Sequence, residues 1–114
     1  MKRNAALLIS LLLLTGLSVE AQEGYKGPGL TPVTVEEAKS LRDDSPVVLQ
    51  GKIVKFLGDE KYLFSDGTGS ITIEIDNRLW RGFSVNQDDP VEITGEIDKD
   101  FRHITIDVRS IKKM

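Results

Sequence analysis

The chain has 114 residues, which is enough for one small domain. It has no cysteine, and this excludes disulfides, thiol catalysis, thiolate metal sites and lipid attachment at an N-terminal cysteine after export. With 15 Lys and Arg against 18 Asp and Glu, the net charge is −3. This balance disfavours nucleic acid as a partner, because a domain that neutralises phosphates needs a basic face.

The first 21 residues are predicted to be a cleavable signal peptide. Lys2 and Arg3 supply its positive end, and an apolar run follows at Ala5–Leu17. Ala21 ends a segment of small or compact residues typical of a signal peptidase site. The alternative is an uncleaved membrane anchor, which needs roughly 20 apolar residues, more than this run has. We therefore expect export to the periplasm, cleavage after Ala21, and no stable membrane insertion of the mature chain.

Residues 22–33 are rich in glycine and proline and predict a flexible leader. A helix is expected to start after Thr34, which is a good N-cap, and Glu37 completes a capping box three residues later. Val35 to about Leu41 would form this helix. Pro46 disfavours helical geometry at the residue before it, so the helix must end earlier.

Two-residue periodicity begins after this helix and predicts three strands. The first runs through Val47–Leu57, with Gly51 in its middle, where glycine permits either a sharp bend or a close backbone crossing. A short second strand is expected at Tyr62–Ser65. The glycine-rich segment Asp66–Gly69 then predicts a hairpin turn, and Ile71–Ile75 alternates as a half-buried third strand.

A short helical turn is expected at Asn77–Gly82, with Asn77 as its cap. Two further strands follow at Val91–Ile97 and Ile104–Val108, separated by a turn at Asp98–Asp100. Five strands with a helix between the third and fourth predict an all-β fold, the five-stranded OB-fold Greek-key barrel, preceded by the N-terminal helix. The predicted domain covers residues 34–114.

Several motifs, in their order and spacing, resemble the bacterial OB-fold (BOF) family of small periplasmic proteins. They are Thr34-Val35-x-Glu37-Ala38, Asp43-Asp44, Val48-x-Leu-x-Gly51-x-Ile53, Tyr62-x-Phe64-x-Asp66-x-Thr-Gly69, Ile73-Glu74-Ile75-Asp76, Trp80-x-Gly82 and Val91-x-Ile-x-Gly95-Glu96-Ile-Asp98-Lys99. One departure is Asn86-Gln87, where the family more often has a proline.

The resemblance implies an exported OB barrel linked to stress tolerance. Family members are associated with resistance to peroxide, metals, acid or cationic antimicrobial peptides. A role in binding small or cationic molecules or envelope components has been proposed for them. The resemblance supplies no established catalytic or binding residues.

The residues themselves predict no catalytic site, no metal site and no cofactor. His103 is the single histidine, and no nucleophile stands at a recognised motif spacing from it. The pair Asp98-x-Asp100 resembles the start of a calcium loop. However, the sixth position of that loop is His103 rather than glycine, and the twelfth is Arg109 rather than glutamate. We therefore interpret this segment as a turn.

OB barrels usually bind ligands across their second and third strands and at the adjoining loops. Here Glu74 and Asp76 are our hypothesis for an acidic pair that attracts a cationic peptide or polyamine; the alternative is a solvated charged face. Trp80 is expected either to plug the end of the barrel or to form a binding platform. Tyr62 and Phe64 share the inward parity and are expected in the core. The hypothetical ligand-binding residues are Lys61, Thr72, Glu74, Asp76, Trp80 and Asp98.

Three functions are compatible with these features. The first is a periplasmic binding protein for a small or cationic ligand or an envelope component, without catalysis. The second is an OB domain that binds single-stranded nucleic acid, which the predicted export and the acidic balance disfavour. The third is an envelope protein that docks on a partner through an exposed strand edge.

Overall fold

The computed structural model describes residues 30–114, so the predicted signal peptide and residues 22–29 of the predicted leader lie outside the described residues. No helix in the described part is long and apolar enough to cross a membrane. The elements, in chain order, are α1 (Val35–Ala38), β1 (Pro46–Gly58), β2 (Lys61–Ser65), β3 (Ser70–Glu74), the 3₁₀ helix η2 (Asn77–Trp80), β4 (Val91–Lys99) and β5 (Ile104–Lys113).

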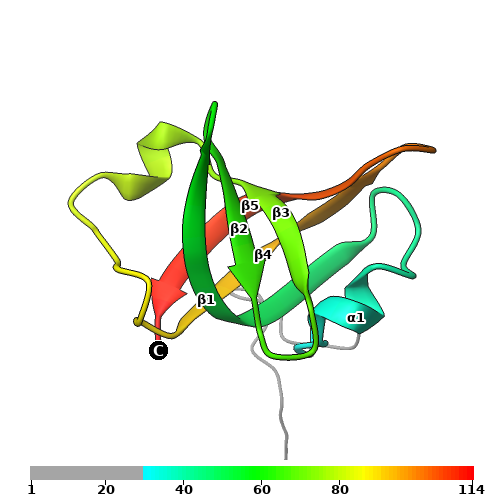
Figure 1. Ribbon diagram of the computed structural model, residues 1–114, viewed down its shortest axis with the longest axis horizontal. Helices are drawn as coiled ribbons and strands as arrows, with labels where there is room; N and C mark the ends of the chain where they lie inside the picture. The colour runs from blue at the N-terminus through cyan, green and yellow to red at the C-terminus, as the bar shows by residue number, and fades with distance from the viewer. Residues whose placement is uncertain (1–29) are drawn as a thin grey trace, which may run out of the picture. The chain divides into compact units, whose positions relative to one another are not determined.

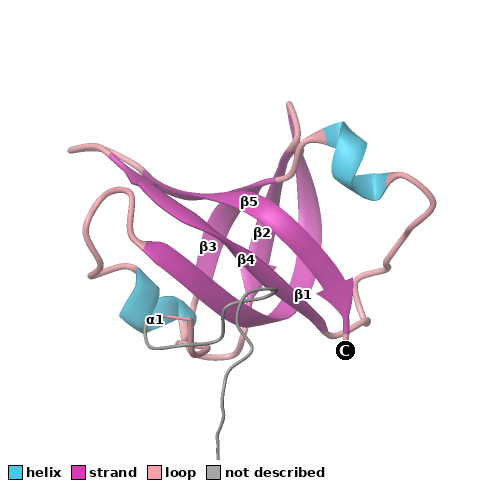
Figure 2. Cartoon of the chain, turned by 180° about the vertical axis from the view of Figure 1, so that it is seen from behind, coloured by secondary structure: helices cyan, strands magenta, loops and turns pink. Residues whose placement is uncertain are grey.

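The five strands form a closed barrel in the order β1-β2-β3-β5-β4 (Figures 1 and 2). The β3–β5 pair is parallel, and every other neighbouring pair is antiparallel. The chain therefore crosses from β3 to β4 through η2 and the loop that follows, and β5 inserts between β3 and β4. This arrangement confirms the predicted five-stranded OB-type barrel.

Strand β1 pairs with two different strands along its length. Its first half, 46–51, pairs with β4, and its second half, 52–58, pairs with β2. Gly51 is the last residue of the first pairing, where the strand curves from one neighbour to the other (Figure 1). A Cβ atom at Gly51 would collide with the backbone carbonyl oxygen of Ser65 and press on the Phe64 ring. Both explanations offered by the sequence, the bend and the close crossing, are confirmed.

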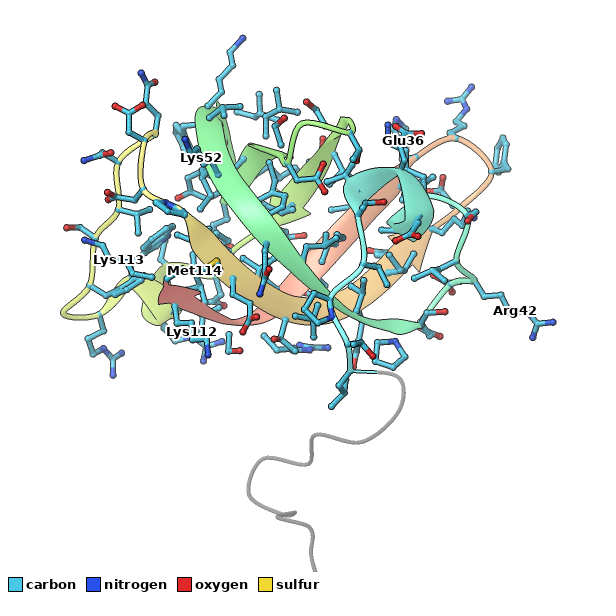
Figure 3. All side chains as sticks on the ribbon, turned by 90° about the horizontal axis from the view of Figure 1, so that it is seen from below. Glu36, Arg42, Lys52, Lys112, Lys113 and Met114 are labelled. Atoms are coloured by element: carbon cyan, nitrogen blue, oxygen red, sulfur yellow. The ribbon has the colours of Figure 1, made fainter. Side chains whose placement is uncertain are left out.

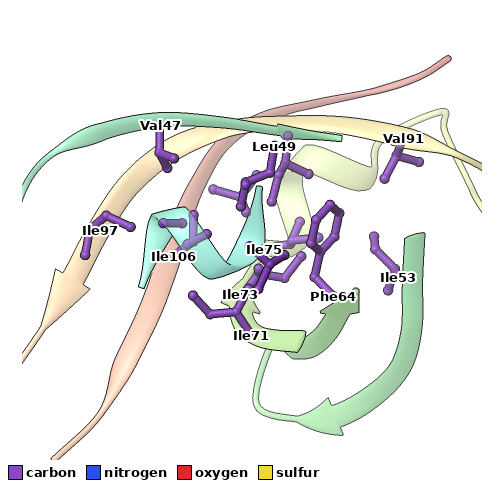
Figure 4. Close-up of a cluster of buried hydrophobic side chains, with 14 residues drawn as sticks. Val47, Leu49, Ile53, Phe64, Ile71, Ile73, Ile75, Val91, Ile97 and Ile106 are labelled. Atoms are coloured by element: carbon purple, nitrogen blue, oxygen red, sulfur yellow. The ribbon is translucent and has the colours of Figure 1, made fainter. Parts of the chain in front are cut away.

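The core consists of inward-facing aliphatic side chains from β1, β3, β4 and β5, and of one aromatic ring, Phe64, from β2 (Figure 4). Phe64 is fully buried, whereas Tyr62 is only half-buried at the end of the barrel. Two residues of α1 close the core on one side, because Val35 and Ala38 are fully buried. The buried strand residues of this core are Val47, Leu49, Ile53, Phe64, Ile71, Ile73, Val91, Ile93, Ile97, Ile106 and Val108, and Ile75 follows β3.

Helix α1 is held at its N-terminus by the hairpin between β2 and β3. The predicted capping box is present, since the Glu37 backbone N–H donates to Thr34 Oγ1 at 3.1 Å and the Thr34 N–H donates to Glu37 Oε1 at 2.9 Å. In addition, the Val35 N–H donates to Asp66 Oδ2 at 2.8 Å. The hairpin therefore satisfies a helix N–H group that would otherwise lack a partner. Figure 3 shows Glu36 at this end of the domain.

Several boundaries differ from the sequence prediction. Strand β5 continues past the predicted end at Val108 to Lys113, and β4 continues through Asp98 and Lys99, which the sequence predicts in a turn, because the two strands pair with each other over this whole length.

Helix α1 ends at Ala38 instead of near Leu41. The N–H groups of Ser40 and Leu41 donate to the carbonyl groups three residues earlier, and the Ser40 hydroxyl donates to the Glu37 carbonyl at 2.9 Å, so the α-helical hydrogen-bond pattern stops. The cap of η2 is Asp76 instead of Asn77. Asp76 has a non-helical backbone, and its carboxylate accepts the Arg78 N–H at 2.8 Å.

We expect the free energy of unfolding of the Asp66→Ala variant to be lower by about 1–2 kcal/mol at neutral pH, because the hydrogen bond from the Val35 N–H to the Asp66 carboxylate is lost. Burial raises the pKa of Asp66, but hydrogen bonds from Thr68 and from the backbone at Val35, Thr68 and Gly69 outweigh it, so the net pKa lies below its usual value of 3.8. A lowered folded-state pKa means that this stabilisation is complete above the usual value and is lost as pH falls through the folded one. Urea unfolding between pH 7 and pH 2.5 measures both effects.

Asp88→Ala is the matched control for this prediction, since it removes an exposed loop carboxylate. Its free energy of unfolding should equal that of the unmodified protein at every pH between 7 and 2.5. If Asp66→Ala lost no stability at pH 7, or if its deficit did not shrink in acid, the capping role of Asp66 would be wrong.

Candidate functional site

A cavity of about 550 Å³ lies between the second half of β1 and the segment that follows β3. It is open to solvent at the end of the barrel where η2 packs. Aromatic and aliphatic side chains form most of its wall. The lining residues are Ile53, Val54, Lys55, Phe56, Tyr62, Trp80, Phe83, Ser84, Val85, Asn86 and Gln87. We refer to this cavity as the aromatic pocket.

Four rings stand in a continuous row along the aromatic pocket. The ring centroids of Phe56 and Tyr62 are 5.2 Å apart, those of Tyr62 and Trp80 are 5.8 Å apart, and those of Trp80 and Phe83 are 5.9 Å apart. Trp80 and Phe83 are stacked with an interplanar angle of 17°. Trp80 Nε1 donates a hydrogen bond to the Tyr62 hydroxyl at 3.2 Å, which satisfies both polar groups inside an apolar wall.

A β-bulge places Phe56 in this row. Strict alternation from the buried Ile53 would send Phe56 to the opposite face of the strand. The pairing register instead skips Val54, so that Ile53 lies opposite Phe64 while Phe56 lies opposite Tyr62. The extra residue reverses the alternation, and the Phe56 ring thereby joins Tyr62 on one face. Phe56 is 63% exposed, so much of this ring is available for contact.

Polar contacts around η2 position the other two rings. The Asn77 N–H donates to Glu60 Oε2 at 2.9 Å, and the Ile75 N–H donates to the Glu60 carbonyl at 2.8 Å. The turn between β1 and β2 thus fixes the start of η2, which carries Trp80. After η2, the Phe83 N–H donates to the Trp80 carbonyl at 2.9 Å, and this turn brings the Phe83 ring onto Trp80.

Four of the six residues expected at the site share the outer face of the sheet. The strand registers place Lys61, Glu74 and Asp107 in one row across β2, β3 and β5. A second row contains Thr72, then Thr105, then Asp98 on β4. The tertiary structure therefore brings together Lys61, Thr72, Glu74 and Asp98, which come from three different strands.

The acids on this outer face are partly neutralised by a neighbouring arginine. Arg109 Nη2 lies 3.0 Å from Glu96 Oε1 and 3.4 Å from Asp107 Oδ2. Lys61 stands directly opposite Glu74 in the β2–β3 register. These basic groups reduce the negative potential that a cationic ligand would meet on the outer face.

Asp76 and Trp80 lie apart from the other four expected residues. Asp76 is beyond the end of β3, and its carboxylate accepts hydrogen bonds from Arg78 Nε and Nη2, each at 2.9 Å. The side-chain hydrogen bonds from Arg78, followed by the one from its backbone, lower the pKa of Asp76 to about 2. Asp76 therefore caps η2 and holds Arg78, and it does not extend the Thr72–Glu74 alternation. Trp80 packs against the core cluster and also lines the aromatic pocket.

Sequence reasoning missed Phe56 and Phe83 as site residues. It also expected Tyr62 only in the core. Four of the seven aromatic side chains of the chain gather at this pocket, but their spacing along the sequence does not indicate it. His103, in contrast, is exposed in the β4–β5 turn with Nδ1 3.8 Å from Asp100. Within residues 30–114, no group of three or more His, Asp or Glu side chains is arranged to hold a metal ion.

The chain is similar to known proteins along nearly its whole length. The family described as "Bacterial OB fold (BOF) protein" matches residues 16–113. Protein YgiW from Escherichia coli K12 is 39% identical, with 100% of this chain and 98% of that protein aligned. The calcium-regulated OB-fold protein CarO from Pseudomonas aeruginosa is also 39% identical, over 96% of this chain and 95% of CarO.

Solved structures agree with this relationship. The structure of the hypothetical protein ygiW from E. coli superimposes with a TM-score of 0.74 at 47% identity, covering 82% of this chain and all of that chain. The telomere capping protein Ten1 from Saccharomyces pombe gives a TM-score of 0.57 at 16% identity over 76% of this chain and 81% of Ten1, a likeness of fold alone. The chain belongs to the bacterial OB-fold (BOF) family.

Proposed function

We propose that this protein is an exported, non-catalytic binding protein that supports stress tolerance at the cell envelope and holds its ligand in the aromatic pocket. The observation that carries this proposal is the row of four rings from Phe56 to Phe83, one of which, Phe56, is 63% exposed. A contiguous apolar surface beside a cavity indicates a site for a ligand or partner, whereas a singly exposed ring does not.

The chemistry of the wall suits small ligands with a flat apolar face or an organic cation. Ring faces of tryptophan, tyrosine and phenylalanine attract cations as well as apolar surfaces. A cavity of about 550 Å³ falls within the size range of small-molecule sites. The aromatic pocket thus supports the idea of a small or cationic ligand without requiring the acidic outer face.

Export and a role in stress tolerance are the parts of the proposal that rest on the predicted signal peptide and on the family. The relative CarO is named as calcium-regulated, and a calcium-regulated role is the only one that the names of the relatives suggest. Fractionation of cells that express the full chain tests export. The cleaved protein is expected in the periplasmic fraction, with Gln22 as its first residue.

Trp80 provides a direct assay for the pocket, because it is the only tryptophan in the chain and it lines the cavity. We expect polyamines, quaternary amines or flat neutral compounds to change Trp80 fluorescence in a saturable way. Phe56→Ala should weaken binding by about fivefold to tenfold, because one exposed ring of the wall is lost. Leu57→Ala is the control, since Leu57 is exposed on the same strand but does not line the pocket.

The same titration separates the pocket from the outer face of the sheet. If the double variant Glu74→Gln, Asp98→Asn weakened binding of the compound while Phe56→Ala did not, the ligand site would be the outer face and the pocket proposal would fail. If no compound of any class changed Trp80 fluorescence, a small-ligand role for the pocket would be contradicted.

A further inference from the structure

The second half of β1 is paired on one side only. From Lys52 to Gly58 its partner is β2, while pairing with β4 ends at Gly51. No other strand in the described part of the chain pairs with the second edge of this segment. Figure 1 shows β2 beside this part of β1. Half of its backbone N–H and C=O groups therefore point away from the sheet.

The same segment exposes apolar side chains to an unusual degree. Val54, Phe56 and Leu57 are 37%, 63% and 45% exposed. The aromatic pocket begins at this edge, because residues 53–56 form one of its walls. An apolar strand edge that is left open beside a cavity indicates an interaction surface, because it offers unpaired backbone groups together with contiguous apolar contact area.

The charges on this edge are basic, although the whole chain is acidic. Lys52 and Lys55 are exposed, neither makes an ion pair with another described residue, and both lie opposite outward-facing residues of β2 (Figure 3 labels Lys52). The nearest acids in sequence, Asp59 and Glu60, lie in the turn after the segment. The Glu60 carboxylate is engaged by the Asn77 N–H.

These features define the two faces of any strand that pairs with β1. Because alternate side chains point to opposite faces, one set would lie on the side of Phe56 and enter the aromatic pocket. The other set would lie on the side of Lys55. Apolar residues suit the first face, and acidic residues suit the second.

We propose that the open edge of β1, residues 52–58, binds an extended peptide segment of a partner protein in which apolar and acidic side chains alternate. The peptide adds a strand to the sheet, its backbone bonds to the free edge, and its apolar side chains fill the aromatic pocket. This inference rests on the proposed function in taking the aromatic pocket as a binding site, and it differs in the occupant, which is a peptide segment and not a small or cationic compound.

A second copy of this chain fits the edge less well. Antiparallel pairing of two β1 edges would place Lys52 and Lys55 of both copies close together on one short pair of strands. Residues 52–58 contain no acid that could neutralise them. Lysines placed on an open strand discourage such self-pairing. An acidic peptide removes this repulsion, which is why we assign the edge to a partner segment.

The test uses the mature protein and the peptide acetyl-EVEFEVE-amide, which contains no tryptophan, so that Trp80 reports binding alone. Three related peptides complete the set. In one, every glutamate is replaced by lysine. The other two carry backbone N-methyl groups, either on the three apolar residues or on the two internal glutamates. In a strand these two sets of N–H groups point to opposite edges, so each N-methylated peptide blocks one edge.

We expect the acidic peptide to bind and the lysine peptide to bind at least about tenfold more weakly, because Lys52 and Lys55 repel it. One N-methylated peptide should lose about tenfold or more in affinity, while the other stays within about twofold, because only one edge of the peptide faces β1. The double variant Lys52→Glu, Lys55→Glu should reverse the charge preference. The control, Lys112→Glu with Lys113→Glu on β5, should not.

Each other outcome is informative. If both N-methylated peptides bound like the parent, the peptide would occupy the pocket without strand pairing, and the inference would be overturned while the proposed function survived. If small compounds changed Trp80 fluorescence but no peptide did, the inference would likewise fail alone. If neither the compounds nor the peptides changed Trp80 fluorescence, both the inference and the proposed function would be wrong.

Discussion

Replacement of Phe64 by alanine is expected to lower the free energy of unfolding by about 3–5 kcal/mol, the range for removing a large aromatic side chain from a packed core. Phe64 has no exposed surface and is the largest side chain that is fully buried in the barrel. Its ring also lies against Gly51, where β1 turns from β4 to β2. The loss would leave a cavity at the point where the two halves of the barrel meet.

Denaturation in urea, followed by circular dichroism, measures this effect. Phe101→Ala is the control, because Phe101 is 95% exposed in the β4–β5 turn and its loss should change stability by no more than about 0.5 kcal/mol. A domain of this size is stable by only about 5–10 kcal/mol, so Phe64→Ala should be partly unfolded at moderate temperature. A variant as stable as the parent would show that the core is not packed around this ring.

Gly95→Ala is expected to destabilise the domain by about 3 kcal/mol, at the upper end of the usual cost of overpacking. A Cβ atom at Gly95 would collide with the carbonyl oxygen of Asp107 and with the Cα of Val108. Both atoms belong to the backbone of β5, so relief requires the β4–β5 pairing to separate. The register of this pair already shifts between Thr94 and Gly95.

The melting temperature of Gly95→Ala, compared with that of the unmodified protein, checks this prediction. Ser110→Ala on β5 is the control, because its side chain is exposed and a smaller residue there meets no neighbour. Because Gly95 does not line the aromatic pocket, ligand titration of the folded fraction should be unchanged. A fully stable Gly95→Ala protein would mean that β4 and β5 do not approach each other this closely.

The strands and the core could be predicted from the sequence because both depend on local alternation. Residues such as Ile71 and Ile73 occupy every second position, and a two-residue period leaves one consistent way to bury them. Gly51 and the Asp66–Gly69 turn then fixed where the sheet bends and reverses. The helix cap at Thr34 was predictable for the same reason, since its partner Glu37 lies three residues away.

The aromatic pocket could not be predicted, because it depends on pairing between residues that are distant in sequence. The bulge at Val54 becomes visible only when β1 is aligned with β2, and without it Phe56 would point away from Tyr62. Likewise, Trp80 reaches Tyr62 only because the β1–β2 turn holds the start of η2 through Glu60. Neither contact leaves a periodic signal along the chain.

The same distinction explains the outcome for the expected site residues. Alternation correctly placed Lys61, Thr72 and Glu74 on one outer face, but Asp76 left that face because the strand ended and its carboxylate capped η2. The sequence by itself determined the family, the five strands and the side chains that fill the barrel, since these follow from local periodicity and motif order. Only the tertiary structure decided which rings meet in the aromatic pocket and which edge of β1 stays open, because strand register and the bulge are set by contacts across the barrel.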